Sequence, residues 1–145
     1  MLRVVAAVAA IAAGATVVYA QNATAIGQRQ AILKTFGGAA KGPGGMMKGA
    51  APFDLAVVQA SLKVLAEGSV KLKDLFPDDS KTGAETYALP AIWEKKADFS
   101  GRWDKLAADS TAAMGAIKDE ASFKTEWPKI GANCGGCHKE YKKSE

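Results

Sequence analysis

The sequence predicts an all-α fold, an antiparallel four-helix bundle, from the spacing of its apolar residues. Four stretches carry apolar residues at alternating steps of three and four, which is the period of an amphipathic helix. No segment of useful length alternates between apolar and polar residues, so no strand is predicted. The connections between the four stretches are short, long and short, which favours antiparallel packing of neighbouring helices.

The first 20 residues are expected to be a secretory signal peptide, which leaves residues 21–145 for the folded domain. A short basic start ending at Arg3 is followed by an uncharged apolar run to Val18, and Ala20 offers a small residue before the expected cleavage. The run is short and rich in Ala and Gly, so an uncleaved membrane anchor is only the lesser alternative. Export, in a bacterium to the periplasm, is the expected localisation.

Length and charge restrict the class of protein. The chain has 145 residues, the size of one domain, and a net charge of +4. Lys and Arg are interleaved with Asp and Glu, which is typical of solvated helix faces and not of a nucleic-acid binding patch. We therefore expect a single domain without a nucleic-acid partner.

The first helix is expected from Ala23 to about Lys41. Its apolar stripe contains one charged residue and consists of Ile26, Arg29, Leu33, Phe36 and Ala40. Glycines and Pro43 are dense between residues 37 and 45, and they should weaken or bend the helix there.

The second and third helices are predicted from the same spacing of apolar residues. Asp54 is expected to cap a helix that ends near Leu75 and Phe76, and residues 77–90 then form a long loop. Pro90 suits the first turn of a single third helix that continues to Ile117. The two stripes are Leu55, Val58, Leu62, Leu65, Ser69 and Leu72, and then Ile92, Phe99, Trp103, Leu106, Ala113 and Ile117.

The fourth helix should begin after Asp119 and carry both cysteines of the chain. Its apolar stripe is Phe123, Trp127, Ile130, Cys134, Cys137 and Tyr141. Because the stripe stays in phase across Pro128, we expect one kinked helix and not two separate helices. A group bound to the two cysteines would then lie in the interior of the bundle.

The segment Cys134-Gly135-Gly136-Cys137-His138 is the C-x-x-C-H pattern of covalent c-type haem attachment. Residues three apart lie on one face of a helix, so both thiols can reach one porphyrin edge and His138 can bind the iron. A structural zinc site would need four ligands, and a thioredoxin-like motif would accompany a βαβ pattern. A local disulfide stays open as an alternative, but it would not explain His138.

Arg29 has two interpretations at this stage. Its side chain can snorkel from the edge of the stripe into water. With a haem in the interior, it can instead pair with a haem propionate.

The chain as a whole resembles cytochrome c′ and the related class II c-type cytochromes. The resemblance rests on the four helices, on the C-x-x-C-H motif within ten residues of the C-terminus, and on shorter matching segments. Those segments are Arg29-Gln30-Ala31-Ile32-Leu33, Lys48-Gly49-Ala50-Ala51-Pro52-Phe53-Asp54 and Pro90-Ala91-Ile92-Trp93. The family often has an arginine four residues after the histidine, and this chain has Lys142 there.

The resemblance implies one covalent haem c, with thioethers at Cys134 and Cys137 and with His138 as the iron ligand. It also implies that Arg29 lies near the propionates and that Leu33 faces the distal side of a five-coordinate iron. The implied function is electron transfer, or binding of nitric oxide or carbon monoxide, without catalytic residues. The implied partners are redox proteins and a second copy of the chain, bound through the first two helices.

Two other functions are kept as alternatives. In six-coordinate members of the family, a methionine at the Leu33 position fills the distal site, and the protein is only an electron carrier. After signal removal the methionines are Met46, Met47 and Met114, and none is expected to reach the iron. The third function is that of a secreted thiol-disulfide protein without haem, which would use Cys134 and Cys137.

Overall fold

The computed structural model describes the backbone of residues 2–144 and the side chains of residues 23–144. Its elements are α1 (Leu2–Met47), α2 (Leu55–Leu72), the 3-10 turn η1 (Asp78–Ser80), α3 (Ala91–Glu94), α4 (Lys96–Ala116) and α5 (Glu120–Tyr141). The described part contains no β-strand, only an isolated antiparallel bridge between Ala88 and Lys142.

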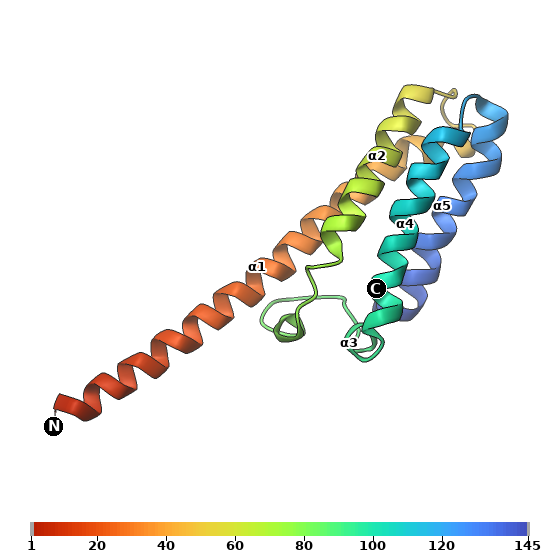
Figure 1. Ribbon diagram of the computed structural model, residues 1–145. Helices are drawn as coiled ribbons and strands as arrows, with labels where there is room; N and C mark the ends of the chain where they lie inside the picture. Colours follow the sequence, from red (N-terminus) through yellow and green to blue (C-terminus); the bar gives the residue numbers. More distant parts are fainter. Residues whose placement is uncertain (1, 145) are drawn as a thin grey trace.

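The four long helices form the expected antiparallel bundle, which confirms the predicted fold class (Figure 1). Helix α1 packs on α2, α2 packs most extensively on α4, and α4 packs on α5. Helices α1 and α5 thus each pack on one member of the α2 and α4 pair. The space between α1 and α5 is where the candidate site lies.

The predicted signal peptide, residues 1–20, falls in the first part of α1, which extends beyond the other helices in Figure 1. The side chains of residues 1–22 lie outside the described part of the chain, so the signal peptide stays a prediction. Within the described residues, no helix combines the length and apolar character that a membrane span requires.

The expected end of the first helix near Lys41 is wrong, because α1 continues through Pro43 to Met47. Pro43 is fully buried, and a Cβ added to Gly42 would lie only 2.9 Å from Cγ1 of Val57 on α2. The small residue at position 42 therefore lets the two helices approach closely. Tertiary packing outweighs the local preferences of glycine and proline here.

The third helix is interrupted, whereas the sequence predicted one continuous helix. Pro90 does open a helix, but α3 ends at Glu94, and Lys95 leaves the helical region with φ −116° and ψ 43° before α4 begins. Helix α2 also ends earlier than expected, at Leu72. Its early end leaves the carbonyl of Leu75 free to accept a hydrogen bond from Arg29 (3.3 Å).

The helix starts predicted at Asp54 and Asp119 are confirmed by their caps. The Asp54 carboxylate accepts from the backbone N–H groups of Ala56 and Val57, and Asp119 forms a capping box with Ser122. Helix α5 then continues across Pro128 without a break, as predicted. The motif residues Cys134 to His138 therefore lie on one regular helix.

The core between the helices is aromatic at the end where α3 lies. Phe76 packs edge-on against Phe99, with ring centroids 4.7 Å apart, and Phe99 packs in the same way against Trp103 and Tyr141. These rings belong to the segment after α2, to α4 and to α5, so they hold three parts of the bundle together. Edge-to-face pairs of this kind stabilise beyond the area that they bury.

Candidate functional site

A cavity of about 660 Å³ lies between α1, α4, α5 and the loop that precedes α3. Its size is within the range of about 300–1,000 Å³ that is typical of small-molecule and cofactor sites. All five residues that the sequence singled out line it, namely Arg29, Leu33, Cys134, Cys137 and His138. The remaining wall is mostly apolar and includes Phe36, Leu65, Phe76, Phe99, Trp103, Leu106, Trp127 and Ile130.

The two thiols of the motif are half-buried in this wall and are not joined in a disulfide. Burial raises the pKa of Cys134, and it raises the pKa of Cys137 to about 11. Thiol-disulfide enzymes depend instead on a lowered thiol pKa, because the thiolate is the nucleophile. The environment of these cysteines therefore does not fit thiol-disulfide exchange.

His138 follows Cys137 on the same helix. It lines the cavity and is still accessible to solvent. Partial burial and the positive charge of Lys142 both lower the pKa of His138. Both effects favour the neutral imidazole, which is the form that binds metal ions. Among the described residues, no group of three or more His, Cys, Asp or Glu side chains is placed to hold a free metal ion.

The opposite wall of the cavity comes from α1, and the described residues of α1 that line it include no metal ligand. Leu33 is half-buried there, and no methionine is among the described residues that line the cavity. Met46, Met47 and Met114 pack into or against the hydrophobic core. The cavity thus has a ligand-bearing wall on α5 and, around Leu33 on α1, an apolar wall.

Arg29 is buried, with only 2% of its surface exposed, so the interpretation that it snorkels into water is wrong. Its guanidinium donates to Ser80 Oγ (2.8 Å), to the Ser80 carbonyl (3.1 Å) and to Thr86 Oγ1 (3.1 Å), as well as to the Leu75 carbonyl. It also lies over the ring of Phe76, 4.6 Å from the centroid. The side chain therefore fixes the end of α2, η1 and the following loop.

The charge of Arg29 is not balanced by a carboxylate among the described residues, since all four acceptors are neutral. Burial lowers the pKa of the guanidinium to about 10, so it stays protonated at neutral pH. A buried charge is costly unless it is paired. A cationic group of this kind in the wall of an apolar cavity fits a ligand that carries an anionic group.

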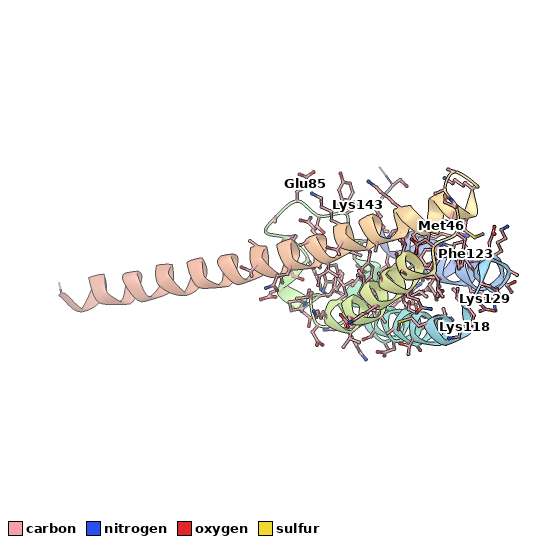
Figure 2. All side chains as sticks on the ribbon, turned by 90° about the horizontal axis from the view of Figure 1, so that it is seen from above. Met46, Glu85, Lys118, Phe123, Lys129 and Lys143 are labelled. Atoms are coloured by element: carbon pink, nitrogen blue, oxygen red, sulfur yellow. The ribbon has the colours of Figure 1, made fainter. Side chains whose placement is uncertain are left out.

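The loop before α3 closes the cavity by pairing with the residues that follow the motif. The Leu89 N–H donates to the Tyr141 carbonyl (3.0 Å), and the Lys143 N–H donates to the Tyr87 carbonyl (2.8 Å). Gln30 of α1 binds the Glu85 carbonyl (2.8 Å), and Glu85 and Lys143 lie near this edge in Figure 2. Sequence reasoning missed Ser80, Thr86 and this pairing, because they join segments far apart in the chain.

A charged network joins the end of the motif helix to α4. Arg102 of α4 donates to Asp98 (2.8 Å) and to Glu140 (2.7 Å), and Tyr141 donates to Asp98 (2.5 Å). Arg102 also lines the cavity. The network ties the last turns of α5 to α4, so a guanidinium borders the cavity even though position 142 is a lysine.

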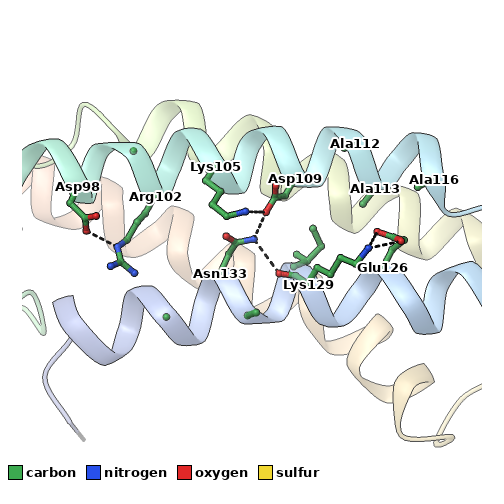
Figure 3. Close-up of a pocket in the computed structure, with 14 residues that line it drawn as sticks. Asp98, Arg102, Lys105, Asp109, Ala112, Ala113, Ala116, Glu126, Lys129 and Asn133 are labelled. Carbon is green, nitrogen blue, oxygen red and sulfur yellow. Dashed lines mark hydrogen bonds and ion pairs between the residues drawn. The ribbon is translucent and has the colours of Figure 1, made fainter.

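A second cavity, of about 860 Å³, lies on the outer side of α4 and α5, and its lining is small and charged where that of the first cavity is large and apolar (Figure 3). Small residues such as Ala112, Ala116 and Ala132 line it, together with charged side chains that pair with one another. Asn133 bridges to Asp109 (2.7 Å) across it. None of the residues that the sequence singled out lines this cavity.

A C-x-x-C-H motif that lines an apolar cavity inside an all-α bundle is the site expected of a c-type cytochrome of the bundle class. The profile of the family described as "Cytochrome C'" matches residues 24–142. The chain belongs to the cytochrome c′ family. As a member, it is a mono-haem c-type cytochrome with a single covalent haem c, which excludes the alternative of a haem-free thiol-disulfide protein.

Similar proteins include two named types of cytochrome. The chain is 54% identical over 117 residues to a cytochrome c' from Rhodopseudomonas palustris, covering 81% of this chain and 80% of the relative. It is 35% identical over 116 residues to a cytochrome c-556 from Agrobacterium fabrum, covering 79% and 78%. The solved structure of a Rhodopseudomonas palustris cytochrome c' matches with a TM-score of 0.82 and 52% identity, covering 83% of this chain and 97% of that one.

Replacing Arg29 by lysine should destabilise the protein, because an ammonium group cannot reproduce the planar four-bond arrangement. We expect Arg29→Lys to lower the free energy of unfolding of the holoprotein by about 3 kcal/mol, the cost of leaving buried acceptors unsatisfied. Urea denaturation measures this loss. Lys34→Ala on the exposed side of the same helix is the control, and equal stability of the two variants would contradict the role given to Arg29.

Proposed function

We propose that the chain is an exported cytochrome whose haem lies in the cavity between α1 and α5, with His138 as the only protein ligand of the iron. Its role would be electron transfer, binding of small gases such as nitric oxide and carbon monoxide, or both. The observation that carries the proposal is the lining of the cavity. It contains both cysteines and the only histidine of the sequence on one wall and Leu33 on the other, and no methionine is among the described residues that line it.

Cys134 and Cys137 would hold the cofactor covalently. Each thiol adds its sulfur and its proton across one porphyrin vinyl group, so the bond forms without an oxidant. The bound haem supplies the redox change and an open coordination position for a gas. Because both thiols lie in the cavity wall on one regular helix, attachment would also keep His138 beside the same cofactor.

Leu33 would cover the second axial side. Its side chain has no lone pair, so it can only occupy space and exclude water. An apolar site without a hydrogen-bond donor disfavours dioxygen and still admits carbon monoxide or nitric oxide when the leucine moves. This gives the protein a selectivity that rests on the apolar wall of α1.

Arg29 would pair with a haem propionate in addition to holding the loop. The support for this role is its unbalanced charge in the cavity wall. A propionate beside the guanidinium would remove the cost of burying that charge. The loop contacts and the propionate contact would then stabilise the same closed edge of the cavity.

The competing function is that of a six-coordinate electron carrier with an axial methionine. The similarity to both cytochrome c' and cytochrome c-556 leaves the coordination number open at the level of the family. The packing of Met46, Met47 and Met114 in the core favours the five-coordinate form. An electron-transfer role is common to both forms and does not depend on this choice.

We also propose the surroundings in which the protein works. The signal-peptide pattern of residues 1–20 and the covalent haem support export to the periplasm, where redox proteins would be its partners. A homodimer through α1 and α2 follows from the family resemblance. Val57 is an exposed apolar side chain on α2 that lies beside Gly42 of α1, and it would become covered in such a dimer.

Loss of both thiols should abolish covalent attachment. In the variant Cys134→Ala/Cys137→Ala, with His138 retained, we expect no haem to stay with the polypeptide after denaturation and acid extraction. The pyridine haemochrome spectrum of the extracted protein measures this. Asn133→Ala, which alters the neighbouring position and keeps both thiols, is the control. Covalent haem in the double variant would refute the site assignment.

The side chain at position 33 should control access to the iron. We expect Leu33→Ala to speed carbon monoxide association about tenfold, which corresponds to about 1.4 kcal/mol of barrier, and Leu33→Met to turn the ferric spectrum low-spin. Lys34→Ala is the matched control, since Lys34 is adjacent in sequence, exposed and not part of the cavity lining. A parent protein that is low-spin until Met46 or Met47 is replaced would establish the six-coordinate alternative.

A further inference from the structure

Gly68, in the middle of α2, is in tight contact with the side chains of α1. A Cβ added at this position would lie 2.3 Å from Cε1 and 2.8 Å from Cζ of Phe36, and 3.2 Å from Cγ2 of Ile32. Real side chains essentially never come so close, so any residue with a Cβ would displace the Phe36 ring. Gly68 is itself buried.

A glycine in the middle of a helix disfavours helix formation, so its presence at position 68 is explained by packing. It is the only glycine of α2, and glycine in a helix interior is less stable than alanine because it loses more backbone freedom on folding. The backbone surface that it exposes is occupied by the edge of the Phe36 ring. The missing side chain is thus replaced by an aromatic ring from the neighbouring helix.

Phe36 connects this contact to the cofactor cavity. Its ring lines the cavity, one helical turn from Leu33, whereas Gly68 does not line it and lies behind Phe36. Protein interiors are close-packed, so a ring pushed away from α2 moves toward the side where the cofactor and its small ligands are bound. The distance between the Phe36 ring and the backbone of α2 at Gly68 therefore determines how much free space remains in the cavity beside Leu33.

We propose that Gly68 is a positioning residue for the distal side of the haem. By receiving the Phe36 ring, it keeps that ring withdrawn from the space into which Leu33 must move when a gas binds. This proposal rests on the proposed function, which assigns α1 to the distal side. It adds a determinant of ligand access that belongs to α2 and touches neither the iron nor the cofactor.

Gly68→Ala tests the proposal in the holoprotein by two measurements. We expect carbon monoxide association about tenfold slower than in the parent protein. We also expect stronger nuclear Overhauser effects between the Phe36 ring and the haem methyl groups in the diamagnetic ferrous carbon monoxide complex. Gly115→Ala in α4 is the matched control, because no atom lies within 4 Å of the Cβ that it adds, and it should change neither measurement.

A second variant separates positioning from general damage. In Gly68→Ala/Phe36→Leu the smaller side chain leaves room for the new methyl group, so carbon monoxide association should return to within about twofold of Phe36→Leu alone. If Gly68→Ala alone does not fold, folding of the double variant supports the contact, and its failure to fold overturns the proposal. Unchanged rates and Overhauser effects in Gly68→Ala, or equally slow binding in the Phe36→Leu background, also overturn it.

These outcomes differ from failure of the proposed function. A low-spin parent protein that does not bind carbon monoxide would refute five-coordination, but its ferrous state would itself be diamagnetic. The Overhauser effects between Phe36 and the haem methyl groups would then be compared in that state. A ring that moves toward the haem in Gly68→Ala supports the role of Gly68, and an unmoved ring contradicts it.

Discussion

The buried guanidinium of Arg29 is the interaction on which the shape of the cavity depends. It satisfies backbone and hydroxyl acceptors from the end of α2, from η1 and from the loop that forms one cavity wall. The same loop is held by the residues that follow the C-x-x-C-H motif. One side chain of α1 therefore couples the second helix, the closing loop and the C-terminal end of the motif helix, and it leaves a positive charge at the cavity.

The two long walls of the cavity have different chemistry. Helix α5 supplies sulfur and nitrogen atoms that can form bonds, and it is tied to α4 by Arg102, Asp98 and Glu140. Helix α1 supplies hydrocarbon around Leu33 and Phe36, with Arg29 and Gln30 at the loop edge, and it packs on α2 through glycine contacts at positions 42 and 68. A cofactor between them would be bonded on one side and only sterically covered on the other. This asymmetry is the physical basis for an iron that keeps one open position.

Local pattern predicted the four helices, their caps and the residues of the motif, because periodicity, capping and C-x-x-C-H spacing are properties of neighbouring residues. It could not predict that α1 passes through Pro43, since packing against α2 favours the continued helix there. It also did not predict that Lys95 divides α3 from α4. The partners of Arg29 were also out of reach, because Ser80 and Thr86 are 51 and 57 residues away in the sequence. Glycine contacts such as that of Gly68 appear only when two helices are placed together.

The coordination of the iron is the most direct test of this account, which rests on a ligand-bearing wall facing an apolar one. Resonance Raman spectroscopy of the ferrous holoprotein detects the iron–histidine stretch of a five-coordinate high-spin haem. We predict that this band is present and that it is lost on addition of carbon monoxide. A ferrous spectrum of a six-coordinate low-spin haem, without an iron–histidine stretch, would contradict the account.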